Sequence, residues 1–405
     1  MQLCLLSENT YPYHVGGVSS WTHALLQGLP DVDVVLVPLY AGTSPAPQRW
    51  SLPDNVSDVR PLQVPDTLSP AAVTRWSHKA RAALPSADLV HALTAGVAGQ
   101  LGRAARTAWG TPLLVTEHGI GWHELEMGTG ETETGHRPDA ADREQDVRRM
   151  QTLARGVYAA ADRIAAVAQS TLEKQVALGA DPSRCTLIPN GVEVPPRPAP
   201  SLTTTAPHIG LVGRVTPLKD ITTFLRACAQ VHHALPEARF SVIGPPADPA
   251  YAARCHALAH HLGLGDALTF VEDAREMSPW YRRLDVVALT SRSEAAPLAL
   301  LEAMAHARPV VATNVGDCQR LVHGPDDAYG AAGLLCPPRS PDAVAQALLA
   351  LATAPQLRYT CGHAGQQRIK AHYQRAHMID AYRDLYTALT ASASSPHTRL
   401  TPTHG

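Results

Sequence analysis

The feature of this chain that most constrains its fold is the alternation of short, continuously apolar runs with segments of helical periodicity. In Ile221–Leu235, for example, apolar side chains recur at the spacing of one face of a helix. The runs are apolar at successive positions, so the strands that they predict have both faces buried. Parallel sheets covered by helices on both faces have this property, and the sequence therefore predicts an α/β protein.

The apolar runs form two series, separated by a segment rich in proline and threonine from Pro189 to His208. Neither a helix nor a strand continues through such a segment, so we expect an interdomain linker there. The predicted architecture is two lobes, residues 1–195 and 196–370, with a ligand cleft between them. The predicted strands are Gln2–Glu8, Val32–Pro38, Ala87–Ala92, Pro112–Thr116 and Asp162–Ala168, then His208–Val212, Arg239–Gly244, Leu268–Val271, Asp285–Thr290 and Pro309–Thr313.

Length and composition exclude several classes of protein. At roughly 100–200 residues per domain, a chain of 405 residues holds two to three domains. A hydrophobic fraction of 45% excludes disorder of the whole chain, and a formal charge of −2 argues against a nucleic-acid partner. Only four of the 34 basic residues are lysines, so a lysine within a motif carries weight.

The chain offers no signal for export or for membrane insertion. Its first residues are strand-like and no basic region precedes them, so we expect no secretory signal. No apolar run reaches the ~18–20 residues of a transmembrane helix. The seven cysteines are odd in number and form no CxxC, which favours reduced, buried thiols. We expect a soluble cytoplasmic protein with a disordered tail over residues 391–405.

Two adjacent glycines, Gly16 and Gly17, follow the first run and open a helix-like segment. Because glycine has no Cβ, the pair lets backbone N–H groups approach a ligand at a helix N-terminus, which favours phosphate. A strand-to-helix turn built for packing explains the pair equally well. The dinucleotide fingerprint GxGxxG is absent from the chain.

Arg214 and Lys219 lie five residues apart in GRVTPLKD, between the run His208–Val212 and a predicted helix. Loops at the carboxyl ends of parallel strands bind ligands in α/β sheets. Two cations above the N–H groups of a helix suit a diphosphate. A solvated loop with two chance cations is the alternative, and the scarcity of lysine favours the diphosphate site.

The segment SRSEAAPLALLEAMA combines a polar turn that holds Glu294 with a helix that carries Glu302, eight residues later. Pro297 suits the first turn of that helix. A carboxylate accepts hydrogen bonds and donates none, so two carboxylates at this spacing suit the paired hydroxyls of a hexose and a ribose. Taken singly, Glu294 could instead be an acid favoured by the helix dipole and Glu302 a residue of the exposed face.

Together these motifs resemble the GT-B retaining glycosyltransferases of family 4, the glycosyl transferases group 1. More narrowly, TYPYHVGGVSSW, TEHGI (Thr116–Ile120) and GRVTPLKDITTF resemble the PelF-type exopolysaccharide glycosyltransferases. The resemblance spans most of residues 1–390 and is weakest in Ala41–Ala80 and Gly121–Arg148. It implies an α/β GT-B fold of two Rossmann-like lobes, an acceptor-side lobe and a nucleotide-sugar lobe, whose parallel sheets face a central cleft. A helix over residues 371–390 is expected to cross back to the first lobe, with packing on its own lobe as the alternative.

The resemblance also implies a role for each site residue. Gly16 and Gly17 would offer backbone N–H groups to the donor phosphates or the acceptor, and Arg214 and Lys219 would hold the diphosphate. The expected catalytic residues are His118, Arg214, Lys219 and Glu294. The other implied positions are Glu294 at the donor sugar, Glu302 at the ribose, Ala296, Pro297 and Leu298 at the phosphate, His118 near the reacting carbon, and Asn190 in the cleft or hinge.

The implied activity is retaining transfer of a hexose from a nucleotide diphosphate sugar, with UDP as the expected nucleotide, to a hydroxyl of a saccharide or natural product. Departure of a diphosphate builds negative charge, which Arg214 and Lys219 would stabilise, so we expect neither a cofactor nor a metal ion. The working mechanism is a same-face substitution in which the leaving phosphate takes the acceptor proton. Expected partners are the nucleotide sugar and the hydroxyl acceptor; no nucleic acid is expected, and peripheral membrane association is left open.

Two other functions stay open. Nucleotide-sugar epimerases share the two-lobed fold and act without an acceptor, and a non-catalytic sugar-binding protein would use the same cleft. His256 and His260 have the i, i+4 spacing of a helical metal pair, but the sparse acids around them favour a surface helix. The acidic segment Glu124–Glu133 is predicted to be a solvated loop, with a mobile lid as the alternative.

Overall fold

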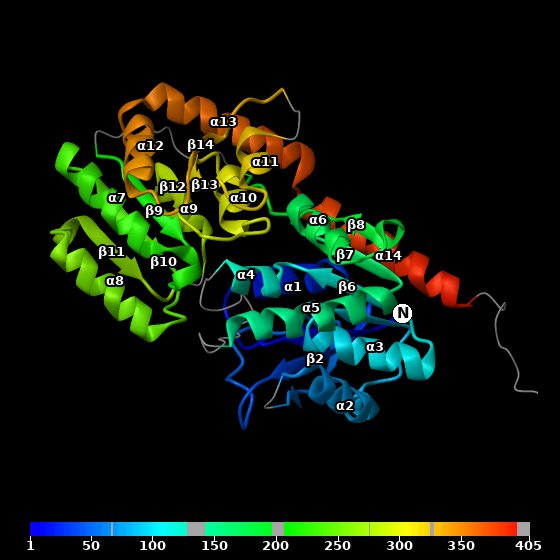
Figure 1. Ribbon diagram of the computed structural model, residues 1–405. Coiled ribbons are helices and arrows are strands. Elements are labelled where there is room, and N and C mark those ends of the chain that lie inside the picture. Colours follow the sequence, from blue (N-terminus) through cyan, green and yellow to red (C-terminus); the bar gives the residue numbers. More distant parts are fainter. Residues whose placement is uncertain (66–67, 128–141, 197–205, 275, 325–327, 395–405) are drawn as a thin grey trace, which may run out of the picture.

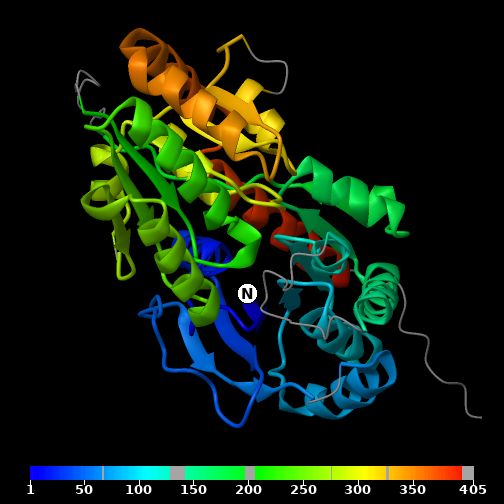
Figure 2. The same cartoon turned by 60° about the vertical axis from the view of Figure 1, so that its left-hand side comes forward.

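The computed structural model describes residues 1–65, 68–127, 142–196, 206–274, 276–324 and 328–394. Two α/β lobes follow one another along the chain, the first coloured blue to green and the second green to orange (Figure 1). Each lobe contains one parallel sheet, with helices against both faces (Figure 1, Figure 2). The prediction of two parallel-sheet lobes is confirmed.

The sheet of the first lobe has the order β3-β2-β1-β5-β6-β7-β8, and β4 also pairs with β2. Its strands are β1 (Gln2–Glu8), β2 (Asp33–Tyr40), β3 (Val56–Val59), β4 (Leu62–Gln63), β5 (Leu89–Ala92), β6 (Leu113–Glu117), β7 (Arg163–Ala166) and β8 (Cys185–Leu187). The helices that cover it are α1 (Gly17–Gly28), α2 (Pro70–Ala80), α3 (Val97–Trp109), α4 (Gly121–Glu126), α5 (Arg143–Ala160) and α6 (Gln169–Ala177).

The sheet of the second lobe has the order β11-β10-β9-β12-β13-β14. Its strands are β9 (His208–Val212), β10 (Arg239–Ile243), β11 (Leu268–Val271), β12 (Val286–Leu289), β13 (Val310–Thr313) and β14 (Gly333–Cys336). The helices of this lobe are α7 (Ile221–Ala234), α8 (Pro249–His261), α9 (Ser278–Arg283), α10 (Leu298–Ala305), α11 (Cys318–His323), α12 (Pro341–Thr353) and α13 (Pro355–His372), and the last helix of the chain is α14 (Arg375–Ser394).

The segment after α13 differs from the prediction of one helix over residues 371–390. The helix is interrupted at Tyr373 and Gln374. Gln374 forms an isolated β-bridge with Val192, so α14 begins only at Arg375. The helix then runs to Ser394, which makes residues 391–394 helical rather than part of a tail, and residues 395–405 lie outside the described residues.

Helix α14 leaves the second lobe and lies along the first, as the red ribbon shows (Figure 1). Its Tyr382 and Tyr386 are fully buried among Leu3, Trp21 and other residues of the first-lobe core. The helix approaches α1 closely at Gly28, where an added Cβ would lie 2.2 Å from Ile379. Burial of this aromatic face therefore joins the end of the chain to its beginning.

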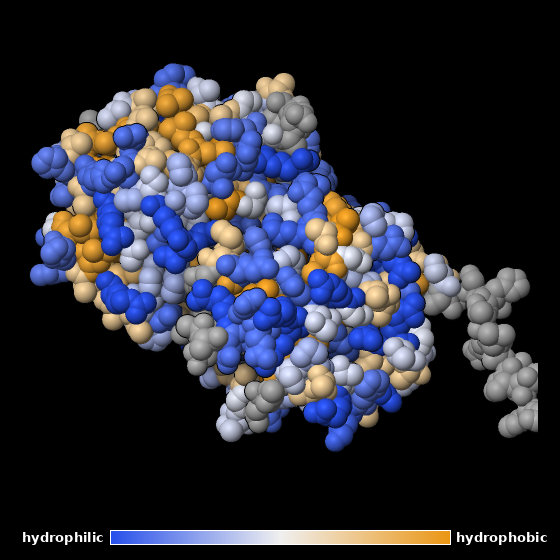
Figure 3. All heavy atoms as spheres, viewed as in Figure 1, coloured by the Kyte–Doolittle hydropathy of each residue, from blue (hydrophilic) through white to orange (hydrophobic). Residues whose placement is uncertain are grey.

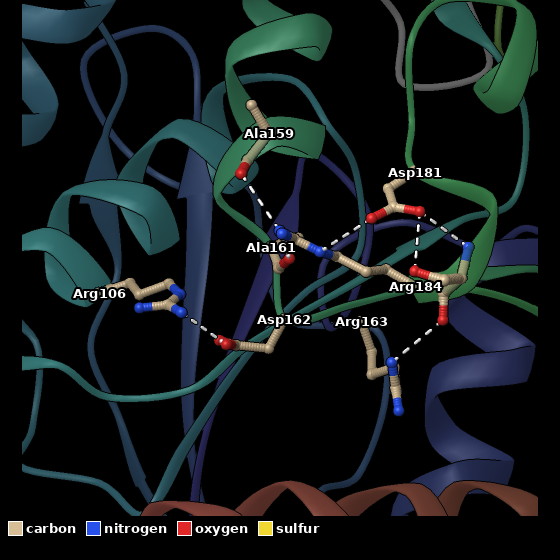
Figure 4. Close-up of polar contacts among 8 residues, drawn as sticks. Arg106, Ala159, Ala161, Asp162, Arg163, Asp181 and Arg184 are labelled. Atoms are coloured by element: carbon tan, nitrogen blue, oxygen red, sulfur yellow. Dashed lines mark hydrogen bonds and ion pairs between the residues drawn. The ribbon is translucent and has the colours of Figure 1, made fainter. Parts of the chain in front are cut away.

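Ion pairs and hydrogen bonds join the segments at the amino ends of β6, β7 and β8 in the first sheet (Figure 4). The Asp162 carboxylate accepts a hydrogen bond from Arg106 Nη2 at 2.6 Å and another from the Leu113 backbone N–H at 2.8 Å. Nearby, Arg184 donates to the Ala161 carbonyl at 3.2 Å at the end of α5. These contacts stabilise the scaffold and leave the opposite edge for ligands.

The described part of the chain contains no helix long and apolar enough to cross a bilayer. The face shown in Figure 3 is mostly hydrophilic, with scattered apolar patches. All seven cysteines are free thiols, and six of them are buried. The acidic segment is not one loop: Glu124 is buried in α4, α5 begins at Arg143, and residues 128–141 lie outside the described residues.

Beneath α14, the fully buried His91 joins the helix to the sheet. Its Nδ1 lies 2.8 Å from Tyr386 Oη and its Nε2 lies 2.8 Å from Thr116 Oγ1. Burial, with a smaller contribution from His118, lowers the pKa of His91 to about 3. The ring is therefore neutral at ordinary pH and links strands β5 and β6 to α14 by hydrogen bonds.

We expect this histidine to make stability depend on pH. The unfolded chain binds a proton near pH 6.5, whereas folded His91 does so only near pH 3, so the free energy of unfolding falls as pH decreases between these values. The slope attributable to His91 approaches ~1.4 kcal/mol per pH unit. Denaturant unfolding of His91→Gln between pH 7 and pH 4 should show a shallower slope than the wild type. The exposed His363→Gln variant is the matched control, and an unchanged slope in His91→Gln would contradict the expectation.

Candidate functional site

The topology of the second sheet fixes where its ligand site lies. The strand order reverses between β9 and β12, which lie side by side, so the loops after these two strands leave in opposite directions and open a crevice. The loop after β9 carries Arg214 and Lys219, and the loop after β12 carries Glu294. These residues therefore meet at the carboxyl edge although they are far apart in the sequence.

A cavity with about 1150 Å³ of empty volume lies at this edge and is walled by both lobes; we call it the interlobe cavity. Every site residue that the sequence indicates lines it. From the first lobe and the linker these are Gly16, Gly17, His118 and Asn190, and from the second lobe Arg214, Lys219, Glu294, Ala296, Pro297, Leu298 and Glu302.

A short ion pair in the interlobe cavity joins the two loops of the second lobe. Lys219 Nζ donates to Glu294 Oε1 at 2.6 Å, and the Ser291 hydroxyl donates to the same oxygen at 2.5 Å. The two charged side chains are only 15% and 8% exposed. Because both side chains are shielded from water, loss of one partner would leave a poorly solvated charge.

Backbone contacts hold Lys219 in place. Asp220 adopts a left-handed conformation with φ of 45°, which ends the short 3₁₀ turn Pro217–Lys219 before α7 begins. Thr290 Oγ1 at the end of β12 donates to the carbonyls of Lys219 and Asp220 at 3.1 and 3.0 Å. The cation-bearing loop is thus hydrogen-bonded to the loop that holds the acid.

Glu302 lies on α10, one turn beyond its first residue, and is partly buried. It accepts a hydrogen bond from Tyr281 Oη at 2.7 Å. Burial raises the pKa of the Glu302 carboxyl, against the lowering effects of Tyr281 and Arg375. The carboxyl is therefore held in one position on the cavity wall, not on an exposed helix face.

His118 follows β6 and faces the interlobe cavity from the first lobe. Its ring packs edge-on against Trp21, with ring centroids 4.3 Å apart, and burial lowers its pKa to about 3. The buried Nε2 atom has no hydrogen-bond partner among the described residues. His118 is thus a neutral group with one nitrogen left for a ligand, and it supplies no positive charge.

Two contacts between the lobes reach the loop that carries Glu294. Asn190 Nδ2 donates to the Ala296 carbonyl at 2.9 Å, while its buried Oδ1 has no partner among the described residues. The Asp317 carboxylate of the second lobe accepts hydrogen bonds from the Gln169 and Ser170 backbone N–H groups at 2.7 and 2.9 Å. These two N–H groups begin α6 of the first lobe, where a carboxylate is favoured by the helix dipole.

The sequence analysis missed Asp317, and it also missed Glu8, Thr10 and Trp122, which line a second cavity in the first lobe. Glu8 ends β1, so the rule that carboxyl ends of parallel strands bind ligands could have identified it. Asp317 carries no such signal, because its partners are backbone N–H groups about 150 positions earlier in the chain.

The metal-pair alternative does not gain support. His256 lies on α8 with its ring tilted by 39° against that of Phe270, at 4.0 Å between ring centroids, and its Nε2 is 3.7 Å from Glu272 Oε1. Within the described ranges, no group of three or more His, Cys, Asp or Glu side chains is arranged to hold a metal ion.

Comparison with known proteins places the chain in a family. Residues 206–354 match the glycosyl transferases group 1, and residues 1–82 and 75–183 match a domain of unknown function. The D-inositol 3-phosphate glycosyltransferase of Kineococcus radiotolerans is 30% identical over 308 residues, which cover 69% of this chain and 67% of the relative. The chain belongs to the group 1 glycosyl transferases. The present group 1 glycosyl transferase is also 31% identical to D-inositol 3-phosphate glycosyltransferase 2 of Catenulispora acidiphila, in a match that covers 66% of the present chain.

The chain spans 63% and 64% of the length of two such relatives, from Catenulispora acidiphila and Kribbella flavida. Among solved structures, sucrose-phosphate synthase from Thermosynechococcus elongatus matches with a TM-score of 0.78 and 22% identity, over 96% of this chain and 99% of that chain. HepE of Anabaena in complex with UDP-glucose matches with a TM-score of 0.72 and 17% identity, over 96% and 100%. At these identities the likeness concerns the fold, which is GT-B.

Gly316, which packs against the loop of Glu294, and Gly16, which lines the interlobe cavity, differ in what an added methyl group would do. At Gly316, where φ is +53°, a Cβ would lie 1.9 Å from the Glu294 carbonyl oxygen. We expect Gly316→Ala to displace the Glu294 loop and to lower the free energy of unfolding by at least about 1–2 kcal/mol from the left-handed backbone alone. Gly16→Ala is the matched control, because its Cβ would meet Arg214 at an ordinary 3.6 Å. Equal unfolding midpoints in denaturant would contradict this expectation.

Proposed function

We propose that this protein is a retaining hexosyltransferase that moves a hexose from UDP-hexose to a hydroxyl acceptor without a metal ion. The observation that carries the proposal is the convergence of Arg214, Lys219, Glu294 and Glu302 on one cavity at the switch point of the second sheet. The cations suit a diphosphate, and the carboxylates suit the hydroxyls of a hexose and a ribose. From the sequence resemblance we also propose that the protein belongs to glycosyltransferase family 4 and is related to its PelF-type members.

In the proposed complex the diphosphate lies between the cationic loop and the N-terminus of α10. Lys219 and Arg214 line the cavity beside the loop 294–298, which leads into α10. The first N–H groups of a helix lack partners within the helix and favour an anion. Fixed cations and N–H groups stabilise the charge that develops on the departing diphosphate more than they stabilise the intact donor. This arrangement is our reason for proposing that no metal ion is required.

The two carboxylates take different parts of the donor. Glu294, held by Lys219 and Ser291, accepts hydrogen bonds from the hexose hydroxyls. Glu302 lies one turn into α10 and accepts from the ribose hydroxyls, while Tyr281 fixes its position. His118 offers its unpartnered Nε2 to the hexose from the first lobe.

The proposed reaction occurs on one face of the hexose. The bond between the anomeric carbon and the leaving phosphate oxygen breaks, and the acceptor oxygen bonds to the same face of that carbon. The acceptor proton passes to the leaving phosphate, so no protein side chain is required as the base. Between the breaking of the bond to the phosphate and the formation of the bond to the acceptor, the hexose passes through an oxocarbenium-like state. The negative charge on the departing diphosphate stabilises that state.

Support for a UDP donor comes from HepE of Anabaena, whose solved structure holds UDP-glucose in the same fold. A transferase is favoured over an epimerase of this fold because a second cavity adjoins the first and shares Val18 and His118 with it. An epimerase needs no site for an acceptor. Incubation of the enzyme with the donor alone, without an acceptor, distinguishes a transferase from an epimerase.

Replacement of Lys219 tests the donor site. We expect Lys219→Met to weaken UDP binding at least about tenfold, because a charge-assisted contact to a phosphate contributes roughly 1.5–3 kcal/mol. Titration calorimetry with UDP gives the dissociation constant. Lys370→Met, which removes an exposed lysine from α13, is the matched control and should bind UDP like the wild type. Unchanged UDP binding in folded Lys219→Met would remove Lys219 from the site.

The stereochemical outcome tests the mechanism. Incubated with UDP-α-D-glucose and no acceptor, the enzyme should release glucose slowly by transfer to water, and the first product in ¹H NMR should be the α-anomer. The rate should be the same with and without EDTA. Initial β-glucose would contradict retention, a rate abolished by EDTA would contradict metal independence, and interconversion of UDP-sugars would favour the epimerase.

A further inference from the structure

A second cavity lies in the first lobe, with about 980 Å³ of empty volume; we call it the first-lobe cavity. It occupies the switch point of the first sheet, because β1 and β5 are neighbours there and the residues after both strands line it. Its lining includes Val18 and His118, which also line the interlobe cavity. A molecule bound in it therefore lies next to the proposed donor hexose.

Three buried polar atoms of this lining lack hydrogen-bond partners among the described residues. They are Thr10 Oγ1, His118 Nε2 and Trp122 Nε1. Thr10 is only 9% exposed, so water reaches its hydroxyl poorly. An unpaired polar atom of this kind is costly unless a ligand satisfies it. His118 Nε2 contacts the donor hexose in the proposed complex, so Thr10 Oγ1, which can donate and accept, and Trp122 Nε1, which donates, remain for a second hydroxyl compound.

The charges of the first-lobe cavity are unlike those of the interlobe cavity. Glu8 and Glu117 line it, and burial raises the pKa of Glu117 while Tyr158 and Gln175 donate hydrogen bonds to it. Among the described residues that line the cavity, Arg149 carries the positive charge, and its Nη1 lies 2.8 Å from Asp146 Oδ1. Since Asp146 balances this charge, the cavity favours neutral or cationic groups over anions.

Glu8 also occupies the position that an anion would take. Its Oε2 accepts from Thr94 Oγ1 at 2.7 Å and from the Ala98 backbone N–H at 3.2 Å, close to the start of α3. A helix N-terminus would otherwise favour a phosphate. The Oε1 atom of Glu8 accepts no hydrogen bond within the described chain and is left for a ligand hydroxyl.

The remaining wall is mostly apolar, and it is contributed by the loop after β5, the segment before α2, and helices α3 and α5. The side chains are Leu68, Leu93, Val97, Met150, Leu153 and Ala154. A small polyol could not bury this surface, whereas a sugar or alcohol with an apolar substituent would cover it.

The resemblance implies that the first lobe is the acceptor side, and we infer that the acceptor bound in its cavity is a hydroxyl compound with an apolar part and without a phosphate. Glu8, Thr10 and Trp122 determine its specificity by pairing with its hydroxyls. The inference rests on the proposed glycosyl transfer and adds the class of the acceptor. It separates this chain from curated relatives that are named for an inositol phosphate.

A matched pair of probes tests the inference: 4-methylumbelliferyl β-D-glucoside and its 6-phosphate, which differ only by the phosphate. Binding of each is measured by saturation-transfer NMR in the presence of saturating UDP. We expect the neutral glucoside to bind at least about tenfold more tightly than the phosphate, because the cavity is acidic. Glu8→Gln should reduce this ratio by removing one negative charge.

Met150→Trp, on α5, tests the location. The added ring should fill the first-lobe cavity and abolish binding of the glucoside while UDP binding stays unchanged. Thr152→Trp, at an exposed position on the same helix, is the matched control and should leave both ligands bound. If Met150→Trp fails to fold, Met150→Phe replaces it.

Equal or tighter binding of the phosphate would overturn the inference, as would a lack of glucoside binding or unchanged glucoside binding in folded Met150→Trp. Calorimetry with UDP alone reports on the proposed function separately. A protein that binds UDP and rejects the neutral glucoside would keep the donor site and lose the acceptor assignment. A protein that binds neither nucleotide nor nucleotide sugar would lose the proposed function itself.

Discussion

In a parallel sheet every strand ends at the same edge, and the chain must leave the sheet there before it returns through a helix. Both lobes of this protein obey that constraint, and both reverse their strand order at the first strand, β1 in one and β9 in the other. A Cβ added at Gly16, in the loop after β1, would lie 3.6 Å from the side chain of Arg214, in the loop after β9, and both residues line the interlobe cavity. The position of the site thus follows from topology before any side chain is chosen.

Much of the fold could be read from the sequence because buried parallel strands are apolar at successive positions. The predicted bounds of β1, β9 and β11 agree with the structure. Strands β3 and β4 were missed because they are short and partly exposed at the sheet edge, so their sequences lack that pattern. The break before α14 was also missed, because it depends on pairing of Val192 with Gln374, a contact between distant segments.

The same distinction holds for the candidate site. Lys219 and Glu294 lie in local motifs with unusual composition, and the fold brings Lys219 Nζ to 2.6 Å from Glu294 Oε1. Asp317 could not be predicted, since an acid becomes a bridge between lobes only when α6 presents its N-terminus to it. Through the Asp317 backbone N–H, which donates to the Ala295 carbonyl at 3.0 Å, this bridge also contacts the loop of Glu294. The position of the first lobe and the geometry of that loop are therefore coupled.

The two cavities differ in charge, and this difference bears on how two substrates could be kept apart. Arg214 and Lys219 line the interlobe cavity together with Glu294 and Glu302, whereas the described lining of the first-lobe cavity has four carboxyl groups, Glu8, Glu117, Glu124 and Asp146, and one arginine, Arg149. A diphosphate is therefore better accommodated in the interlobe cavity, so the donor has one favoured orientation across the shared residue His118. Burial lowers the pKa of His118 to about 3, which keeps it neutral and adds no charge of either sign between the cavities. An acceptor without phosphate then avoids competition with the diphosphate for the same cations, and each substrate can bind without displacing the other.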